Sequence, residues 1–514
     1  MMQTEVLVIG SGLAGSIAAL TAAEAGREVV IITKTEDLMS GSTPHAQGGI
    51  IYRGEDDTKD KLKEDILIAG DGASWEPAVD QLVEMGPRLV KELLIDKFQV
   101  QFDYASEYQL DLAEEGAHSV RRIIHSKDKT GMAIHEKIIP FLKNHPNITI
   151  LTDHTAIDLL TLSHHSTNPL DIYLKPACFG AFVMNNKTNE IFPVYAQNTI
   201  LATGGFGQIY INTTNPPENT GDGIALAYRA GARAFNLHYM QFHPTTYYGA
   251  KERFLISESV RGEGGILIDH KGRRFMKKYH ELAELAPRDV VARAIYDTML
   301  ETAHPCVYLD ITHKNPEWLK DRFPTIYGYL IKNGVDMTAE PIPVVPAAHY
   351  SCGGVGVSLK GRTSLQRLWA VGEVSCTGVH GANRLASTSL LEALTWGYIA
   401  GKEVSNPNLS DDYYPEIFDW VSEIEDVDNA LIAQDWLTIK NTMWNYVGLV
   451  RSRQRLLRAH QMLRHLQTEI EAFYRQARMS HEVVQLRNGV ITAYAVTNSA
   501  IEDRVSRGAH FLKD

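Results

Sequence analysis

The segment EVLVIGSGLAG, residues 5–15, decides the fold of this chain. Residues 5–9 form a short apolar run that predicts a buried strand, and a helical pattern follows at about 16–25. A second apolar run at 28–33 completes a β-α-β unit. Because neither strand alternates polar with apolar residues, we expect a parallel sheet that is covered on both faces.

The turn between the first strand and the helix reads G-x-G-x-x-G, with glycine at 10, 12 and 15. In such a turn the first glycine allows the tight bend, the second lets the backbone approach a pyrophosphate, and the third lets helix and strand pack closely. The helix N-terminus adds N–H groups and a positive dipole end. The turn therefore predicts dinucleotide binding by Gly10, Ser11, Gly12, Leu13, Ala14 and Gly15.

The end of the second strand departs from this pattern. An acid about 20 residues after the glycines normally binds the ribose, but this strand ends in Lys34, and Glu36 comes two residues later. We expect Lys34 to stand near the adenosine end instead. Two small-residue stretches follow, SGST at 40–43 and AQGG at 46–49, which are either a flexible surface loop or a source of hydroxyls and amides for the cofactor. The cofactor interpretation selects Ser42, Thr43, Gln47, Gly48 and Gly49.

Length and composition limit the class of protein. A chain of 514 residues exceeds the typical domain of about 150 residues, so two or three domains are expected. The net charge of −12 and the lack of a long basic stripe argue against a nucleic-acid partner. The four cysteines are scattered, and no apolar run approaches the ~18 residues of a membrane span. We therefore expect a soluble, cytoplasmic protein without a metal site or a membrane segment.

The order of patterns predicts the domain organisation. Strand-then-glycine patterns recur at NTILATGG (198–205) and LWAVGE (368–373), as expected for central strands with ligand-facing turns. The glycine-, proline- and charge-rich stretch between them predicts an inserted domain at 238–345. The cofactor domain would then comprise 1–237 and 346–407, and helical periodicity predicts a C-terminal helical domain at 413–514. The arginine cluster at 451–458 is interpreted as a solvated helical face.

Short polar motifs lie in the inserted domain and at its two ends. They are QFHPT at 241–245, SE at 257–258, APRD at 286–289, PAAHY at 346–350 and GANRL at 381–385. Each alone has a structural explanation, since a lone histidine often serves the fold and an exposed Arg–Asp link is worth ~1 kcal/mol or less. Together they place cations and donors on turns, which suits an anionic substrate because an arginine can hold a carboxylate bidentately.

These motifs, in this order, resemble the flavoprotein family of fumarate reductase, succinate dehydrogenase and L-aspartate oxidase. The resemblance runs from GSGLAG through STPHAQGGI, QFHPT, SESVRGEGG, LAPRDVVARAI, PAAHYSCGGV and GEVSCTGVHGANRLASTSLLE to SRGAHF. It implies an α/β, Rossmann-like FAD-binding domain, an inserted α+β capping domain that closes over the substrate, and a C-terminal helical domain. It also implies hydride exchange with flavin N5.

The resemblance assigns roles to individual residues. Arg288 would be the acid/base, although an arginine with a pKa above ~12 can transfer protons only in a closed, dry site. His243, His349 and Arg384 would bind substrate carboxylates. Ser257, where relatives often have threonine, and Glu258 would complete the pocket. The remaining cofactor contacts would be Asp222, Glu373, Ser389 and Leu390.

Two positions distinguish members of the family. Covalent members link the flavin to a histidine where this chain has Ser42, with His45 three residues further on, so noncovalent FAD is implied. The stretch EEGAHS at 114–119 resembles REGGHS of L-aspartate oxidases, with Glu114 for arginine and Ala117 for glycine. Glu115 would supply the counter-charge that a desolvated substrate ammonium needs. The other interpretation places Glu115 on a surface loop.

The resemblance therefore implies oxidation of L-aspartate to iminoaspartate, with reoxidation by oxygen or fumarate. This is the first step of NAD biosynthesis through quinolinate, and quinolinate synthase would be a transient partner. Two alternatives remain open. A soluble fumarate reductase or succinate dehydrogenase flavoprotein is disfavoured by Glu115 and Ser42. A catalytically silent FAD-binding or redox-sensing protein is disfavoured by the set of Arg288, His243, His349 and Arg384.

Overall fold

A central sheet organises the molecule. The structure, a computed structural model, describes residues 2–54, 56–107, 109–250, 253–406, 413–421 and 426–513. The sheet has 7 strands in the order β8-β2-β1-β11-β10-β9, with β18 also paired to β11. Strands β8, β2, β1, β11 and β18 run parallel, as predicted, and β10 and β9 extend the sheet antiparallel. The strands are β1 (Met2–Ile9), β2 (Val29–Ile32), β8 (Ile148–Leu151), β9 (His154–Thr161), β10 (Cys178–Asn185), β11 (Ile191–Leu201) and β18 (Leu368–Ala370).

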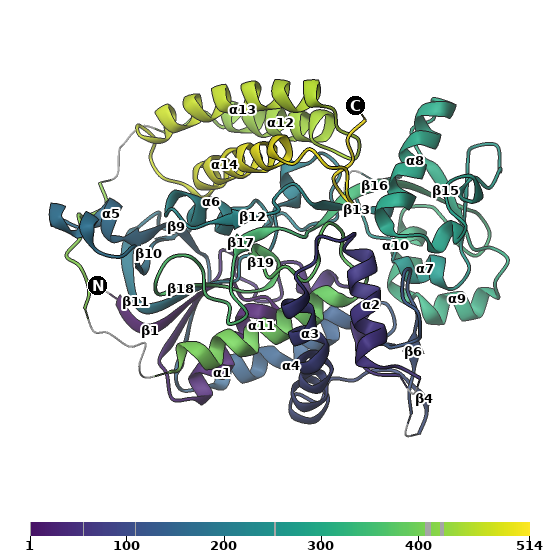
Figure 1. Cartoon of the computed structure of the whole chain (residues 1–514), viewed down its shortest axis with the longest axis horizontal. Helices are drawn as coiled ribbons and strands as arrows, with labels where there is room; N and C mark the ends of the chain where they lie inside the picture. Colours follow the sequence, from purple (N-terminus) through teal and green to yellow (C-terminus); the bar gives the residue numbers. More distant parts are fainter. Residues whose placement is uncertain are drawn as a thin grey trace.

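Both faces of this sheet are covered, which explains the unbroken apolar strands. Successive side chains of a strand point to opposite faces. Val6 and Val8 belong to one core with α1 (Leu13–Glu24), α3 (Glu76–Leu89), α4 (Thr130–Asn144) and α11 (Thr388–Val404), which lie below the sheet in Figure 1. Leu7 and Ile9 belong to a second core on the other face.

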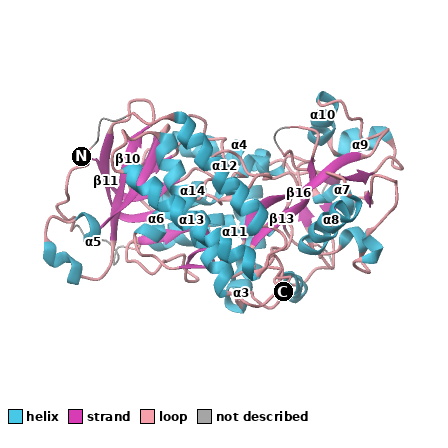
Figure 2. Ribbon diagram, turned by 90° about the horizontal axis from the view of Figure 1, so that it is seen from above, coloured by secondary structure: helices cyan, strands magenta, loops and turns pink. Residues whose placement is uncertain are grey.

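Three long helices contribute to that second core. They are α12 (Asn429–Tyr446), α13 (Arg453–Tyr474) and α14 (His481–Glu502), and Figure 2 shows them lying over the sheet. On the cofactor domain, α14 packs against α6 (Asp222–Arg229), and α12 packs against the short 3-10 turn Gly207–Ile209. The predicted end of the second cofactor segment at residue 407 lies outside the described residues.

Two details of the cofactor domain differ from the sequence expectation. Helix α1 begins at Leu13 rather than at about residue 16, because Gly12 is its N-cap and the glycine motif itself forms the first turn. Strand β18 covers only residues 368–370 and pairs with the end of β11, so LWAVGE is not a central strand. The hydrophobic pattern of a six-residue segment could not show where the helix begins or whether the strand is central in the sheet.

The inserted segment forms a second sheet with its own core. Its strand order is β13-β16-β15-β14, all antiparallel, and it stands at the right of Figure 1. The strands are β13 (Met240–Tyr247), β14 (Ile266–Ile268), β15 (Val307–Asp310) and β16 (Ile342–Ser351). The helices are α7 (Glu258–Gly262), α8 (Arg288–Thr302), α9 (Pro316–Arg322) and α10 (Pro324–Lys332). The boundary proposed at 345 falls inside β16, which continues without a break to Ser351.

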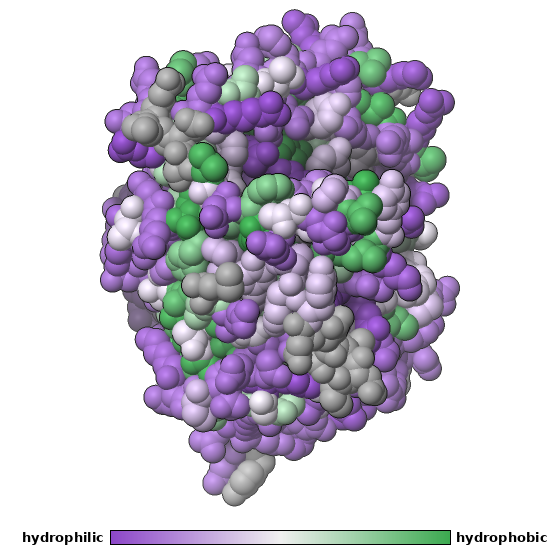
Figure 3. Space-filling model, turned by 90° about the vertical axis from the view of Figure 1, so that its left-hand side faces the viewer, coloured by the Kyte–Doolittle hydropathy of each residue, from purple (hydrophilic) through white to green (hydrophobic). Residues whose placement is uncertain are grey.

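Short elements complete the described fold. They are β3 (Ile50–Ile51), β4 (Tyr104–Ser106), β5 (Gln109–Leu110), β6 (Leu112–Ala113), β7 (Ile123–Ile124), β12 (Ala234–Phe235), β17 (Gly354–Gly356), β19 (Ser375–Cys376), α2 (Lys59–Ala69) and α5 (Leu162–His165). Figure 3 shows the end of the molecule that carries α5 and β10, where hydrophilic and apolar side chains are interspersed. No helix in the described ranges is long and apolar enough to span a membrane.

The C-terminal tail returns to the rest of the molecule. Arg293 of α8 donates to the carbonyl of Gly508 at 2.8 Å, and the N–H of Ala509 donates to the carbonyl of Ala382 at 2.9 Å. Arg451 is fully buried, and its Nη1 lies 2.7 Å from Nδ1 of His510. The interpretation of the 451–458 cluster as a solvated face is therefore wrong for its first member, which fastens the tail.

Candidate active site

A cavity of about 790 Å³ lies where the cofactor domain meets the inserted domain. Except for Gly15, every residue predicted to bind cofactor or substrate lines this cavity. Gly15 instead faces the turn, where an added Cβ would lie 2.1 Å from the carbonyl oxygen of Gly10. The structure thus places Gly15 in the packing role that its motif position predicts.

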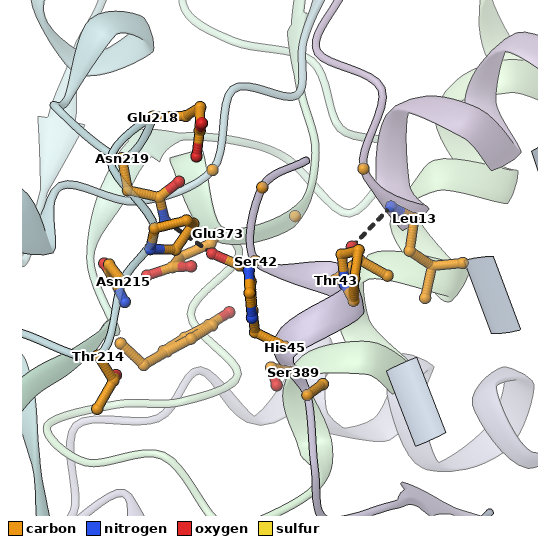
Figure 4. A pocket seen from close by; sticks show the side chains of 18 of the residues that line it. Leu13, Ser42, Thr43, His45, Thr214, Asn215, Glu218, Asn219, Glu373 and Ser389 are labelled. Carbon is orange, nitrogen blue, oxygen red and sulfur yellow. Dashed lines mark hydrogen bonds between the residues drawn. The ribbon is translucent and has the colours of Figure 1, made fainter. Parts of the chain in front are cut away.

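The glycine turn and the small-residue loop hold each other in place. Gly10 has φ +112°, and a Cβ there would lie 2.3 Å from the carbonyl oxygen of Ala202, so the position requires glycine. The N–H of Leu13 donates to Oγ1 of Thr43 at 3.0 Å, and Nδ2 of Asn219 donates to Oγ of Ser42 at 2.7 Å (Figure 4). These bonds fix the 40–49 loop against the turn on one side and against Asn219 on the other, so it is not a free surface loop.

The chemistry of the cavity wall fits a dinucleotide with a flat polar ring. Oε1 of Gln47 is buried and has no hydrogen-bond partner among the described residues, so it can accept from a ring N–H. Glu373 accepts the N–H of Ser351 at 3.0 Å, and burial raises the pKa of its carboxyl to about 7. A glycine turn, an unpartnered amide oxygen and a buried carboxyl together suit a phosphate-bearing group with ring N–H or hydroxyl donors.

Lys34 and Asp222 bind each other at the cavity edge. Nζ of Lys34 lies 2.6 Å from Oδ2 of Asp222, and Nδ2 of Asn488 donates to Oδ1 at 3.0 Å. Burial alone would raise the pKa of Asp222, but the charge and the hydrogen bond of Lys34 lower it. The two residues predicted separately as cofactor contacts therefore form one ion pair, which also joins the cavity to α14.

At the other end of the cavity a glutamate bridges two arginines. Nε of Arg288, at the start of α8, donates to Oε2 of Glu258, and Nη2 of Arg261 lies 3.2 Å from Oε1. Nη1 of Arg288 also donates to Oε1 of Gln241 at 3.1 Å. Burial would raise the pKa of Glu258, but the charges of Arg288 and Arg261 lower it. Arg288 is thus fixed by two acceptors and still lines the cavity.

Two neutral histidines stand beside this bridge. The rings of His243 and His349 are 5.1 Å apart, on neighbouring strands β13 and β16. Nδ1 of His349 lies 2.7 Å from Oγ1 of Thr214, and Nδ1 of His243 accepts the N–H of Thr245 at 3.2 Å. Burial, and next the charge of Arg288, lowers the pKa of both rings well below the ordinary value. They therefore serve as hydrogen-bond donors and acceptors, not as cations.

Arg384 supplies another guanidinium group at the substrate end of the cavity. It is 4% exposed, its Nη1 donates to Oγ of Ser389 at 3.1 Å, and its guanidinium carbon lies 4.5 Å from the ring centre of Tyr350. Burial, and next the charge of Arg288, lowers its pKa to about 10, so it remains a cation. Arg288 and Arg384 therefore offer two guanidinium groups to an anionic ligand.

Glu115 is buried in the cavity wall rather than on a surface loop. It is 4% exposed, its Oε2 accepts from Oγ of Ser387 at 2.6 Å, and its Oε1 accepts from Oγ of Ser259 at 3.2 Å. No cation of the described chain lies within ion-pair distance of it. A buried carboxylate held by two hydroxyls is ready to receive a cationic group of a ligand.

The loop that carries Glu115 keeps its shape despite its unusual sequence. Ala117, which stands where the resemblance has glycine, has φ +66°, in the left-handed region that favours glycine. Nε2 of His118 lies 3.0 Å from the carbonyl oxygen of Ala386, and buried Arg122 pairs with Asp65 at 2.6 Å. Contacts with residues outside the loop therefore hold its shape, which lets Ala117 adopt a backbone conformation that favours glycine.

Comparison with known proteins identifies the family. Profiles described as the FAD binding domain and the fumarate reductase flavoprotein C-term match residues 5–390 and 437–514. The chain is 43% identical to L-aspartate oxidase 1 of Ralstonia nicotianae, over 100% of this chain and 96% of that protein. It is 42% identical to the L-aspartate oxidase of Pseudomonas aeruginosa, over 100% and 95%. The chain belongs to the L-aspartate oxidase family.

Membership of this family confirms FAD as the cofactor and the three-part architecture. The structure is similar to that of E. coli quinol fumarate reductase, with a TM-score of 0.89 and 26% identity over 100% of this chain and 92% of that one. The L-aspartate oxidase family and this fumarate reductase thus share one fold, and the side chains of the site must account for their difference.

Several side chains of the site were not predicted from the sequence. They are Gln241, Ser259, Arg261, Tyr350 and Ser387, and each lies within or beside a motif that was recognised. Their role depends on partners far away in the chain, such as Ser387 for Glu115, which is 272 residues earlier. Only the left-handed φ of +58° at Ser387 marks its position locally, and that is a property of the structure.

Proposed function

We propose that this chain oxidises L-aspartate to iminoaspartate, with FAD as the electron acceptor. The charge pattern of the cavity carries the proposal. Arg288, Arg384, Glu115 and Glu258 line its substrate end, and Arg261 pairs with Glu258 behind the cavity wall. These five side chains together leave one net positive charge. L-Aspartate carries one net negative charge and neutralises it, whereas succinate carries two and has nothing for Glu115 to bind.

The side chains divide the binding of aspartate among them. Arg384 and Arg288 each hold one carboxylate, since a guanidinium matches a carboxylate in a bidentate manner. Neutral His243 and His349 add hydrogen bonds at the same end. Glu115 accepts the ammonium, which fixes the nitrogen and so directs the C2–H bond. The bound FAD supplies the acceptor for the hydride that leaves C2.

The proton balance involves the nitrogen and the arginine bridge. The substrate ammonium gives up a proton and C2 gives up a hydride, so that the C–N bond becomes a protonated imine, which loses a second proton to solvent to give iminoaspartate. Glu115 is the base placed at the nitrogen. When fumarate is the oxidant, Arg288 is the proton donor to carbon, and Glu258 lies between Arg288 and Arg261 to restore its proton. Water must be kept out for an arginine to act in this way.

The reduced enzyme is reoxidised by oxygen or by fumarate. Fumarate carries two carboxylates for the same two arginines and has no ammonium group for Glu115 to bind. The imine product hydrolyses readily, so an enzyme that consumes it must act quickly. In the context of NAD biosynthesis this is quinolinate synthase, and a transient contact with it would protect the imine.

A single anaerobic experiment tests the proposal. L-Aspartate, D-aspartate and succinate are added in turn to the holoenzyme while the visible absorbance of the flavin is recorded. We expect L-aspartate alone to bleach the flavin. If L-aspartate leaves it oxidised while fumarate oxidises the chemically reduced enzyme, the chain is a fumarate reductase and the proposal is wrong.

A further inference from the structure

The guanidinium of Arg384 is held without a carboxylate partner. Its Nε is buried and has no hydrogen-bond acceptor, and none of the described acidic side chains lies within ion-pair distance of it. Its only side-chain hydrogen bond in the described chain is to Oγ of Ser389, at 3.1 Å. Because a buried cation without an anion is costly, something else must hold this group in place.

The face of the Tyr350 ring provides that support. The guanidinium carbon of Arg384 lies 4.5 Å from the centre of the ring. Cation–π attraction is strongest when both groups are desolvated, and Arg384 and Tyr350 are 4% and 6% exposed. Tyr350 lines the cavity beside His349, so the stack lies at the substrate end.

A buried carboxylate fixes the far edge of this ring. The hydroxyl of Tyr350 donates to Oε2 of Glu392 at 2.9 Å, and Nε2 of His380 donates to the same oxygen at 2.9 Å. Oγ1 of Thr377 donates to the other carboxylate oxygen. Glu392 is 1% exposed and lies on α11, whose first turn also carries Ser389.

Glu392 supports the ring through its hydroxyl and does not compete for the N–H groups of Arg384. Burial would raise the pKa of Glu392, but the His380 charge and the hydrogen bonds of His380, Thr377 and Tyr350 lower it, so the group is ionised. The phenol ring separates this anion from the guanidinium. A direct Glu–Arg pair would occupy the N–H donors that a substrate carboxylate needs, whereas contact with the face of the ring leaves them free.

We propose that Tyr350, anchored by Glu392, is a positioning residue for Arg384, holding the guanidinium by its face so that its N–H donors point to a carboxylate of the substrate. This inference rests on the proposed function, in which Arg384 binds one carboxylate of a dicarboxylate. A purely structural role for the Tyr350–Glu392 pair predicts lost stability and unchanged substrate affinity.

The test compares three variants of the holoenzyme by two readouts. The first readout is the Kd of succinate, obtained from the perturbation of the flavin spectrum, and the second is the split between KM and kcat for L-aspartate. We expect Tyr350→Leu to raise both Kd and KM about 30-fold, the equivalent of about 2 kcal/mol, with a much smaller change in kcat. Tyr350→Phe, which keeps the ring, should recover most of this loss.

Tyr474 offers a matched control. It is also buried under an arginine, with the guanidinium carbon of Arg487 4.1 Å from its ring centre, but it lies on α13 and does not line the cavity. Tyr474→Leu should lower the unfolding temperature and leave the succinate Kd unchanged. An equal succinate Kd for Tyr350→Leu and wild type, or equal losses for the Leu and Phe variants, would overturn the proposal.

A third variant covers the case in which Tyr350→Leu does not retain flavin. Glu392→Gln keeps the ring but removes one of the two carboxylate oxygens that accept from Tyr350, His380 and Thr377. The ring should then be held less firmly and the succinate Kd should rise several-fold, and an unchanged Kd contradicts the inference. Because succinate binding needs no turnover, the succinate Kd tests the positioning role of Tyr350 separately from the proposed oxidation of L-aspartate. A wild-type enzyme that binds succinate but is not reduced by L-aspartate refutes the proposed function and leaves this test intact. A wild-type enzyme that does not bind succinate overturns the positioning role itself.

Discussion

Replacing Glu115 by glutamine tests how the site distinguishes aspartate from other dicarboxylates. The change is nearly isosteric, and the amide can still accept from Ser387 or Ser259, so the fold should persist. What is lost is the charge opposite the substrate ammonium. Removing one partner of a buried, hydrogen-bonded charge pair costs about 2–5 kcal/mol. At 1.4 kcal/mol per tenfold, kcat/KM for L-aspartate should fall by roughly 30- to 3000-fold.

The assay measures both half-reactions on one protein. Flavin reduction by L-aspartate is followed anaerobically, and reoxidation of the reduced enzyme by fumarate is followed in the same cell. Fumarate has no ammonium, so its rate should change less than about tenfold. The neighbouring acid Glu114 is exposed, and Glu114→Gln is the control that should behave as wild type. Equal losses for aspartate and fumarate in Glu115→Gln would refute the pairing of Glu115 with the ammonium.

Three other changes have definite expected outcomes. Arg288→Lys should keep FAD and the fold but lose at least about 100-fold in turnover, since the contact with Glu258 is broken; normal turnover would remove Arg288 from catalysis. In FAD-free protein, burial raises the pKa of Glu373 to about 7, so its protonated form should add stability that is fully present below pH 4.5. This stability should be lost as the pH rises through 7, and denaturant titrations of Glu373→Gln at several pH values should not show the loss. His510→Ala should lower the unfolding free energy by about 2 kcal/mol because buried Arg451 loses one of its acceptors, and an unchanged urea midpoint would contradict this.

The sequence predicted those features that depend on neighbouring residues. The glycine turn, the parallel sheet and the presence of an inserted domain follow from local spacing and composition, whereas its α+β character was implied by the family resemblance, and the structure has all of them. The same local reading missed the start of α1, because a glycine motif that forms the first helical turn has no apolar period of its own. It also treated the short β18 as a central strand, since pairing partners are not written in a six-residue segment.

The site was predicted as a set of residues but not as a network. Every predicted ligand-binding residue except Gly15 lines one cavity, yet the sequence did not show that Lys34 binds Asp222 or that Glu258 lies between two arginines. The sequence also could not show the protonation states of the side chains in the site. His349 appeared among cations and donors, and only its burial beside a guanidinium shows that it is neutral.

The pairing of β11 with β18 has a consequence for how the enzyme is made. The two strands meet in the finished sheet, but β11 ends at Leu201 and β18 begins at Leu368, with the whole cap between them. A ribosome adding about 5–20 residues per second needs on the order of 10–30 s to cover that interval. The cap has its own apolar core and can condense during this time. The flavin pocket, whose wall includes Glu373 and Ser389, is completed only afterwards, so loading of the cofactor is a late event in the biogenesis of this enzyme.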